Sequence, residues 1–79
     1  MQDKERNEDI FKLANYYKAN ATPVHITLGS GTWLNGTILS VNKEFKDRLV
    51  LMEARFGRML LFFNRIIDDG IVPKRKEVG

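Results

Sequence analysis

Residues 23–39, PVHITLGSGTWLNGTIL, most strongly constrain what this chain can fold into. Apolar and polar residues alternate on both sides of Gly29-Ser30-Gly31, a pattern typical of two antiparallel strands that are joined by a turn and buried on one face. Gly36 lies inside the second predicted strand, where a glycine usually marks a bend or a close approach of another backbone. Because a strand that bends at glycine lets a small sheet curl, this hairpin predicts a strongly bent antiparallel sheet.

The residues before the hairpin predict one amphipathic helix over residues 7–19. Asn7 is suited to cap its first turn, and Pro23 requires it to end around residues 19–22, because the residue before a proline disfavours helix. Residues 1–6 are predicted to be a flexible, charged lead-in. The apolar face of the helix at 3.6-residue spacing comprises Ile10, Phe11, Leu13, Ala14 and Tyr17.

Three further strands follow the hairpin. Residues 49–52 form a continuous apolar run suited to a strand covered on both sides, and residues 58–63 form a second, strongly apolar strand. Asp68-Asp69-Gly70 predicts a tight turn before a short closing strand at residues 71–73. The predicted fold class is therefore mainly β: an N-terminal α-helix and a five-stranded, strongly bent antiparallel sheet that forms a small barrel over residues 23–73. Residues 1–79 are one domain, and residues 74–79 are a basic tail.

Composition narrows the classes of function. A chain of 79 residues buries only about 60% of its unfolded surface, and without cysteine it has no disulfide, so oligomerisation is the expected source of further stability. The single histidine and the lack of cysteine argue against a metal site, a cofactor and an enzyme. A net charge of +3 allows an anionic partner. With no apolar run near the roughly 18 residues of a membrane span and no leader-like start, we expect a cytoplasmic protein.

The hairpin motif, with Pro23-Val24, Gly31, Leu34 and Gly36 followed by Ile38 and a polar turn near Asn42, resembles the first sequence motif of the Sm-like (LSm/Hfq) RNA-binding proteins. Phe63-Asn64-Arg65 resembles a substituted form of the aromatic-Lys-His sequence of Hfq. The Arg-Gly pair of the spliceosomal members is absent. Residues 71–73, Ile-Val-Pro, resemble the closing strand of Hfq. The resemblance covers most of the chain after the predicted helix and implies an Sm-like barrel.

The resemblance also implies a partner and an assembly. Sm-like proteins form homo-oligomeric rings, which for this chain means about five to seven subunits, with the fourth strand of one subunit paired to the fifth strand of its neighbour. In such rings the loops after the second and fourth strands line a pore, and each subunit holds one base of single-stranded RNA. We therefore expect an RNA chaperone or scaffold that binds short U- or A-rich RNA without making or breaking bonds.

Four residues are predicted to bind RNA. Phe45 is suited to stack on a base, Asn42 and Asn64 to read base edges, and Arg65 to contact phosphate. Each has a structural alternative: Phe45 plugs the barrel, Asn42 caps a turn, and Arg65 pairs with Asp68 or Asp69. Lys43, Lys46 and Arg48 are weaker phosphate candidates.

Trp33 is a further candidate with three open interpretations: a subunit contact, a second RNA surface of the Hfq kind, or packing against the helix. The alternative function for the whole chain is a structural or protein-assembly module that keeps the Sm-like fold, binds protein partners and has lost RNA binding. The absent Arg-Gly pair, the replaced Lys-His sequence and the modest net charge favour this alternative.

Overall fold

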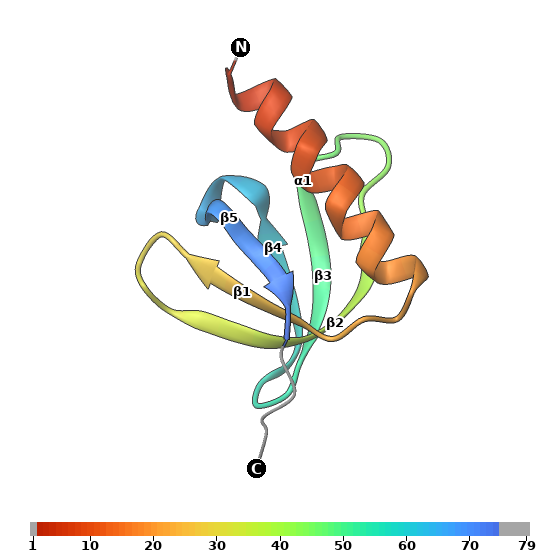
Figure 1. The fold of residues 1–79 in the computed structure, drawn as a ribbon, viewed down its shortest axis with the longest axis vertical. Coiled ribbons are helices and arrows are strands. Elements are labelled where there is room, and N and C mark those ends of the chain that lie inside the picture. The colour runs from red at the N-terminus through yellow and green to blue at the C-terminus, as the bar shows by residue number, and fades with distance from the viewer. Residues whose placement is uncertain (1, 75–79) are drawn as a thin grey trace.

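The structure, a computed structural model that describes residues 2–74, contains one helix followed by five antiparallel strands in a single sheet (Figure 1). The predicted mainly β class, with the helix first and five antiparallel strands after it, is confirmed. A one-turn 3-10 helix, η1, joins the last two strands. The elements are α1 (Gln2–Ala19), β1 (Val24–Leu28), β2 (Trp33–Val41), β3 (Arg48–Glu53), β4 (Gly57–Phe62), η1 (Phe63–Arg65) and β5 (Ile66–Pro73).

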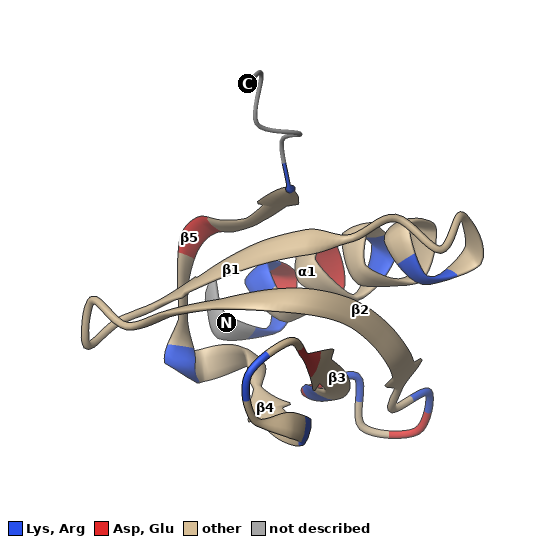
Figure 2. Ribbon diagram, turned by 90° about the horizontal axis from the view of Figure 1, so that it is seen from below, with Lys and Arg blue, Asp and Glu red and all other residues tan. Residues whose placement is uncertain are grey.

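The sheet has the strand order β4-β3-β2-β1-β5, and every neighbouring pair is antiparallel. Strands β4 and β5 are therefore its two edges. Among the described residues no ladder joins these edges, so the sheet is open and the predicted closure into a barrel is not confirmed. Figure 2 shows that β2 curves along its length and carries β3 and β4 away from β1.

The bend of β2 has a local cause at Gly36, which pairs with Glu53 of β3. A Cβ atom at Gly36 would lie 2.0 Å from the carbonyl oxygen of Met52, a separation that no side chain tolerates. The close backbone approach predicted from this glycine is therefore confirmed. The ladder between β2 and β3 also shifts register between Ile38 and Ser40, and such a bulge increases the local bend.

Helix α1 begins at Gln2, earlier than the predicted start at Asn7, and residues 2–6 are helical rather than a flexible lead-in. These residues contain no glycine or proline, and the side chain of Arg6 fixes them to the sheet. Arg6 donates hydrogen bonds to the carboxylate of Asp68 (2.7 Å), to the carbonyl oxygen of Phe63 (2.9 Å) and to the carbonyl oxygen of Ile66. The end of the helix at Ala19 agrees with the prediction.

The core lies between α1 and the concave side of the sheet. Ala14 is fully buried, and Ile10, Phe11 and Tyr17 are partly buried against the core, whereas Leu13 is exposed at the edge of the predicted apolar face. The strands and η1 supply the other buried apolar side chains, which are Val24, Ile26, Leu34, Ile38, Val41, Leu49, Leu51, Leu61, Phe63, Ile66 and Ile71. One core therefore unites the helix with all five strands.

The segment Asp68-Asp69-Gly70 is not the predicted tight turn, because all three residues lie inside β5. The ladder with β1 pairs Ile26 with Ile71 but Leu28 with Ile66, so β5 bulges here. Asp69 has a φ of 57°, in the left-handed region that the turn pattern also favours. The turn pattern thus predicted an irregular backbone at these residues correctly. The chain does not reverse direction there, however, and β5 continues alongside β1.

Strands β3 and β4 are each covered by this chain on one face only, which for β3 is contrary to the prediction of a strand covered on both sides. Leu49, Leu51 and Leu61 point into the core, whereas Met52, Leu60 and other alternate residues are exposed on the outer face. This leaves an apolar surface beside the β4 edge.

Of the predicted basic tail, residues 75–79 lie outside the described residues, and the amide of Lys74 donates to the carbonyl oxygen of Pro23 (2.9 Å).

The substitution Gly36→Ala should destabilise the fold, because the added methyl group collides with backbone rather than with a movable side chain. We expect a loss of about 1–3 kcal/mol in the free energy of unfolding, measured by urea denaturation. Gly29→Ala is the matched control: its Cβ would have only an ordinary contact at 3.8 Å, and its effect should stay within about 0.5 kcal/mol. Equal losses at the two glycines would contradict the close approach.

The substitution Arg6→Met should loosen the first turns of α1 and η1 together, because it removes the donor shared by two carbonyl groups and Asp68. We expect a loss of about 1–3 kcal/mol in unfolding free energy and faster hydrogen exchange near both segments. Lys12→Met, on the exposed side of the same helix, is the control. Unchanged exchange near η1 would show that Arg6 does not hold it.

Candidate nucleic-acid interface

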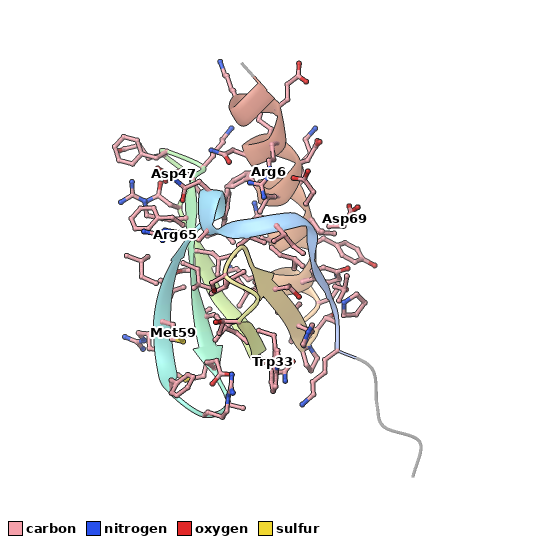
Figure 3. All side chains as sticks on the ribbon, turned by 90° about the vertical axis from the view of Figure 1, so that its left-hand side faces the viewer. Arg6, Trp33, Asp47, Met59, Arg65 and Asp69 are labelled. Carbon is pink, nitrogen blue, oxygen red and sulfur yellow. The ribbon has the colours of Figure 1, made fainter. Side chains whose placement is uncertain are left out.

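The loop after β2 and the 3-10 turn after β4 meet at one end of the sheet. The backbone amide of Phe63 donates to the carbonyl oxygen of Asp47 across a distance of 2.8 Å, which joins the two segments directly. Figure 3 shows Asp47 and Arg65 at this end, and Trp33 at the opposite end. Two of the predicted RNA-binding residues, Asn42 and Phe45, therefore lie on a loop that is bonded to the turn carrying the other two, Asn64 and Arg65.

Asn42 holds the loop in shape. Its side-chain oxygen accepts a hydrogen bond from the amide of Phe45 (2.7 Å), and its carbonyl oxygen accepts one from the amide of Lys46 (3.1 Å). Its own amide donates to the carbonyl oxygen of Arg48 (3.0 Å). The turn-capping alternative for Asn42 is thus what the structure contains, and only its side-chain NH₂ group is left as a donor toward a ligand.

Phe45 is 62% exposed, so it does not plug the interior as its structural alternative required. The guanidinium of Arg48 lies 5.3 Å from the centre of its ring and 5.0 Å from the centre of the Phe62 ring, which is 40% exposed. Cation–π contacts of this kind hold flat surfaces in place while their outer faces remain open to solvent. We call the set Asn42, Phe45, Arg48, Phe62, Asn64 and Arg65 the loop-end cluster.

Arg48 is itself neutralised by its neighbour in the chain. Its Nε and Nη2 atoms donate to the two carboxylate oxygens of Asp47 at 2.8 and 3.1 Å. This bidentate pair lowers the pKa of Asp47 and raises that of Arg48, in both cases mainly through the side-chain hydrogen bond. The positive charge of Arg48 is therefore largely neutralised by Asp47, and its guanidinium supports the rings of Phe45 and Phe62.

Asn64 and Arg65 are exposed on η1, and their turn is held by a hydrogen bond from the amide of Gly29 to the carbonyl oxygen of Arg65 (2.8 Å). Asp68, one predicted partner of Arg65, pairs instead with Arg6. Within residues 2–74, no ion pair involves the Arg65 side chain. Both side chains border a groove of about 430 Å³ that is also lined by Leu28, Gly29, Ser30, Leu60, Leu61 and Phe62.

A second aromatic surface lies at the opposite end of the sheet. The guanidinium of Arg55, in the turn between β3 and β4, lies 4.4 Å from the centre of the Trp33 ring system and 4.8 Å from that of Phe56. The rings of His25 and Trp33 stack with their centres 5.7 Å apart, and Phe56 is 64% exposed. Trp33 therefore packs on His25 and Arg55. We call Trp33, Arg55, Phe56 and His25 the turn-end cluster.

The turn-end cluster is organised by Glu53, the buried carboxylate of β3. Its oxygens accept hydrogen bonds from the amides of Asn35, Arg55 and Phe56, and from the Nε atom of Arg55. Burial by itself raises the pKa of Glu53, but these donors outweigh it and lower the pKa to about 2. A charged Glu53 thus fixes Arg55, whose Nη2 atom also donates to the carbonyl oxygen of Trp33 (2.8 Å).

Sequence reasoning missed Phe62 and Arg55 and ranked Arg48 too low. The signal was partly visible: Arg48 lies three residues from Phe45, and Arg55 is next to Phe56. The contact between Arg48 and Phe62, however, depends on the β3–β4 register, in which these two residues are directly paired. Alternation within one strand cannot provide a register between two strands.

The described residues are sparse in other kinds of site. No group of three or more His, Cys, Asp or Glu side chains within residues 2–74 is arranged to hold a metal ion. In the same part of the chain, no helix combines the length and the apolar character that a membrane crossing requires.

The substitution Glu53→Gln should weaken the fold in a pH-dependent way. Because folding lowers the pKa of Glu53 from 4.5 to about 2, the stability from the ionised carboxylate is complete above about pH 4.5 and is lost as the pH falls through about 2. Urea denaturation between pH 7 and pH 2 should therefore show a difference between wild type and variant that shrinks in acid. Glu44→Gln, on the exposed loop, should follow the wild type throughout; a constant gap for Glu53→Gln would contradict the shifted pKa.

Compared with the models of known protein families and with curated proteins, the chain matches none of them. The resemblance to Sm-like proteins thus continues to depend on the hairpin motif and on the residues after β4. What the geometry adds is a backbone hydrogen bond that joins the two predicted loops and the contact of Arg48 with the rings of Phe45 and Phe62.

Proposed function

We propose that this protein binds short single-stranded RNA, U- or A-rich, through the loop-end cluster, and that it acts as an RNA chaperone or scaffold of the Sm-like kind in the cytoplasm. The observation that carries the proposal is the bond between Phe63 and Asp47, which places the two predicted binding loops side by side. The helix followed by five bent antiparallel strands is also the architecture that the resemblance implies.

The side chains of the cluster match what an unpaired nucleotide needs. The open face of Phe45 offers a stacking platform that every base accepts, and the Arg48 contact with both rings keeps this platform in place. The side-chain NH₂ group of Asn42 supplies a donor for a base edge, and the side-chain amide of Asn64 supplies both a donor and an acceptor. Arg65, exposed and without an ion-pair partner among the described residues, supplies the charge for a phosphate. No bond is made or broken in this function.

We further propose that about five to seven copies form a ring, because within residues 2–74 no strand pairs with the outer edge of β4 or of β5. Head-to-tail pairing of these edges repeats the loop-end cluster around an axis. A strand of RNA then meets several equivalent sites, and contacts that are weak for one subunit add up to tight binding. The exposed Leu60 beside the β4 edge fits a strand that is covered by a neighbour.

One observation favours the alternative, a structural or protein-assembly module without RNA binding. Arg48 and Arg55, the arginines at the centre of the two aromatic clusters, are each paired with a carboxylate, Asp47 and Glu53 respectively. This pairing leaves few cations for phosphate. The two functions differ in salt dependence, because phosphate contacts are weakened steeply by salt and most protein contacts are not.

The substitution Phe45→Ala should lower the affinity for a fluorescent oligo-U or oligo-A by about one to two orders of magnitude, since base stacking contributes about 1–3 kcal/mol. Arg65→Ala should lower affinity and also reduce the slope of log affinity against log salt by about 0.7 for each subunit that contacts the RNA. Fluorescence anisotropy between 50 mM and 300 mM salt measures both effects.

Phe56→Ala is the matched control, because Phe56 is as exposed as Phe45, also lies under an arginine, and sits at the other end of the sheet. It should leave oligo-U affinity unchanged if the loop-end cluster is the site. Wild-type protein that binds neither RNA at 50 mM salt would refute the proposed function and favour the assembly module.

A further inference from the structure

A groove of about 440 Å³ lies between residues 5–13 of α1 and residues 66–71 of β5, and we call it the α1–β5 groove. Its floor is apolar, because five aliphatic side chains line it: Ile10, Leu13, Ile66, Ile67 and Ile71. Leu13 is 36% exposed and Ile67 is 42% exposed, so part of this floor faces water. A concave surface with an apolar floor is the usual form of a binding site.

Carboxylates stand on both walls of the groove, and Figure 2 shows acidic residues on α1 and on β5. Glu5 and Asp9 are four residues apart on α1, which places them on the same side of the helix. Asp68 and Asp69 come from β5. The only cation of the lining, Arg6, is bonded to Asp68 and to two carbonyl groups. Within residues 2–74 no ion pair involves Glu5, Asp9 or Asp69, so three carboxylates remain to attract a cation.

The β5 wall of the groove is shaped by the bulge in this strand. The register with β1 skips residues 67–70, and the first three of these are all exposed, which an evenly alternating strand does not allow. A Cβ atom at Gly70 would lie 2.7 Å from the carbonyl oxygen of Ile67 and 2.8 Å from that of Thr27, so the backbone is tightly packed here. The bulge therefore holds one apolar and two acidic side chains at the same groove.

The shape of the groove suits an organic cation that has apolar parts. No group of three or more acidic or histidine side chains within residues 2–74 is arranged to hold a metal ion, so the carboxylates do not converge on one point. Residues 5–13 span about 12 Å of helix, which is the length of about four residues of extended chain. Lysine and arginine side chains bury their aliphatic stems while their charged ends reach carboxylates, so a peptide can cover the floor and meet both walls.

We infer that the α1–β5 groove docks a basic peptide segment of a partner protein, one in which lysine or arginine residues accompany aliphatic ones. The chain has a net charge of +3, so the molecule as a whole repels such a peptide and the attraction is local to the carboxylates of the groove. This peptide site goes beyond the proposed RNA site, because the groove and the loop-end cluster share no residue. It uses side chains between α1 and β5, whereas the proposed ring uses the outer backbone edge of β5.

Fluorescence anisotropy with a labelled heptapeptide of alternating lysine and leucine tests this site at about 100 mM salt, where the Debye length is about 10 Å. We expect saturable binding with a Kd below about 1 mM. A heptapeptide of alternating lysine and serine has the same charge but cannot cover the apolar floor. It should bind at least about tenfold more weakly.

Removing one carboxylate from each wall tests the charge contribution. The double variant Asp9→Asn with Asp69→Asn keeps the shape of both side chains, and asparagine tolerates the left-handed φ of 57° at position 69. We expect it to bind the lysine–leucine peptide about fivefold more weakly than the wild type. Glu8→Gln with Glu44→Gln is the matched control, because it removes two carboxylates from exposed positions outside the groove and should keep the wild-type affinity.

The apolar floor is tested by Ile67→Ser, with Val72→Ser as its control. Both residues are 42% exposed on β5, but only Ile67 lines the groove. Only Ile67→Ser should lower the affinity, by about fivefold, and circular dichroism verifies that each variant is folded. The peptide site is refuted if the lysine–leucine peptide does not bind below about 1 mM, if the lysine–serine peptide binds as tightly, or if either groove variant binds like its control.

Discussion

The close approach of β2 and β3 at Gly36 is the constraint on which the rest of the structure depends. Because Gly36 has no side chain, its backbone can lie against the carbonyl of Met52, and this close approach lets the two strands cross tightly and the sheet bend. The bend lets one helix and one small core cover the concave side. It also leaves the outer face of β3 and β4 exposed to solvent, and in the part of the chain that the structure describes both sheet edges lack a paired strand. A chain of this size therefore keeps exposed surfaces that are suited to binding partners.

Local sequence patterns predicted the parts of the fold that local chemistry controls. The hairpin, its glycine turn and the end of α1 before Pro23 follow from residue type and spacing, and they are present. The early start of α1 depends on Arg6 reaching residues about sixty positions away, and the continuous β5 depends on pairing with β1 across the Asp68–Gly70 bulge. Neither contact leaves a periodic signal in the chain, so neither was predicted.

The candidate site shows the same division. Asn42, Phe45, Asn64 and Arg65 could be singled out because loops carry exposed polar and aromatic residues. Their mutual placement and the supporting role of Arg48 emerge only from strand register, which sets Arg48 opposite Phe62. Arg48 and Arg55 are each paired with a carboxylate, so their positive charges are largely neutralised. A count of basic residues in the sequence therefore overstates the positive charge that is available to an anionic ligand.

The reach of Arg6 has a practical consequence for handling this protein. One side chain near the start of the chain organises the turn that presents Asn64 and Arg65, through carbonyl groups at both of its ends. Arg6 therefore affects the candidate binding surface indirectly, by holding the turn that carries Asn64 and Arg65. A purification tag fused close to Arg6, or a shortened first helical turn, would perturb that surface while leaving every residue in it intact.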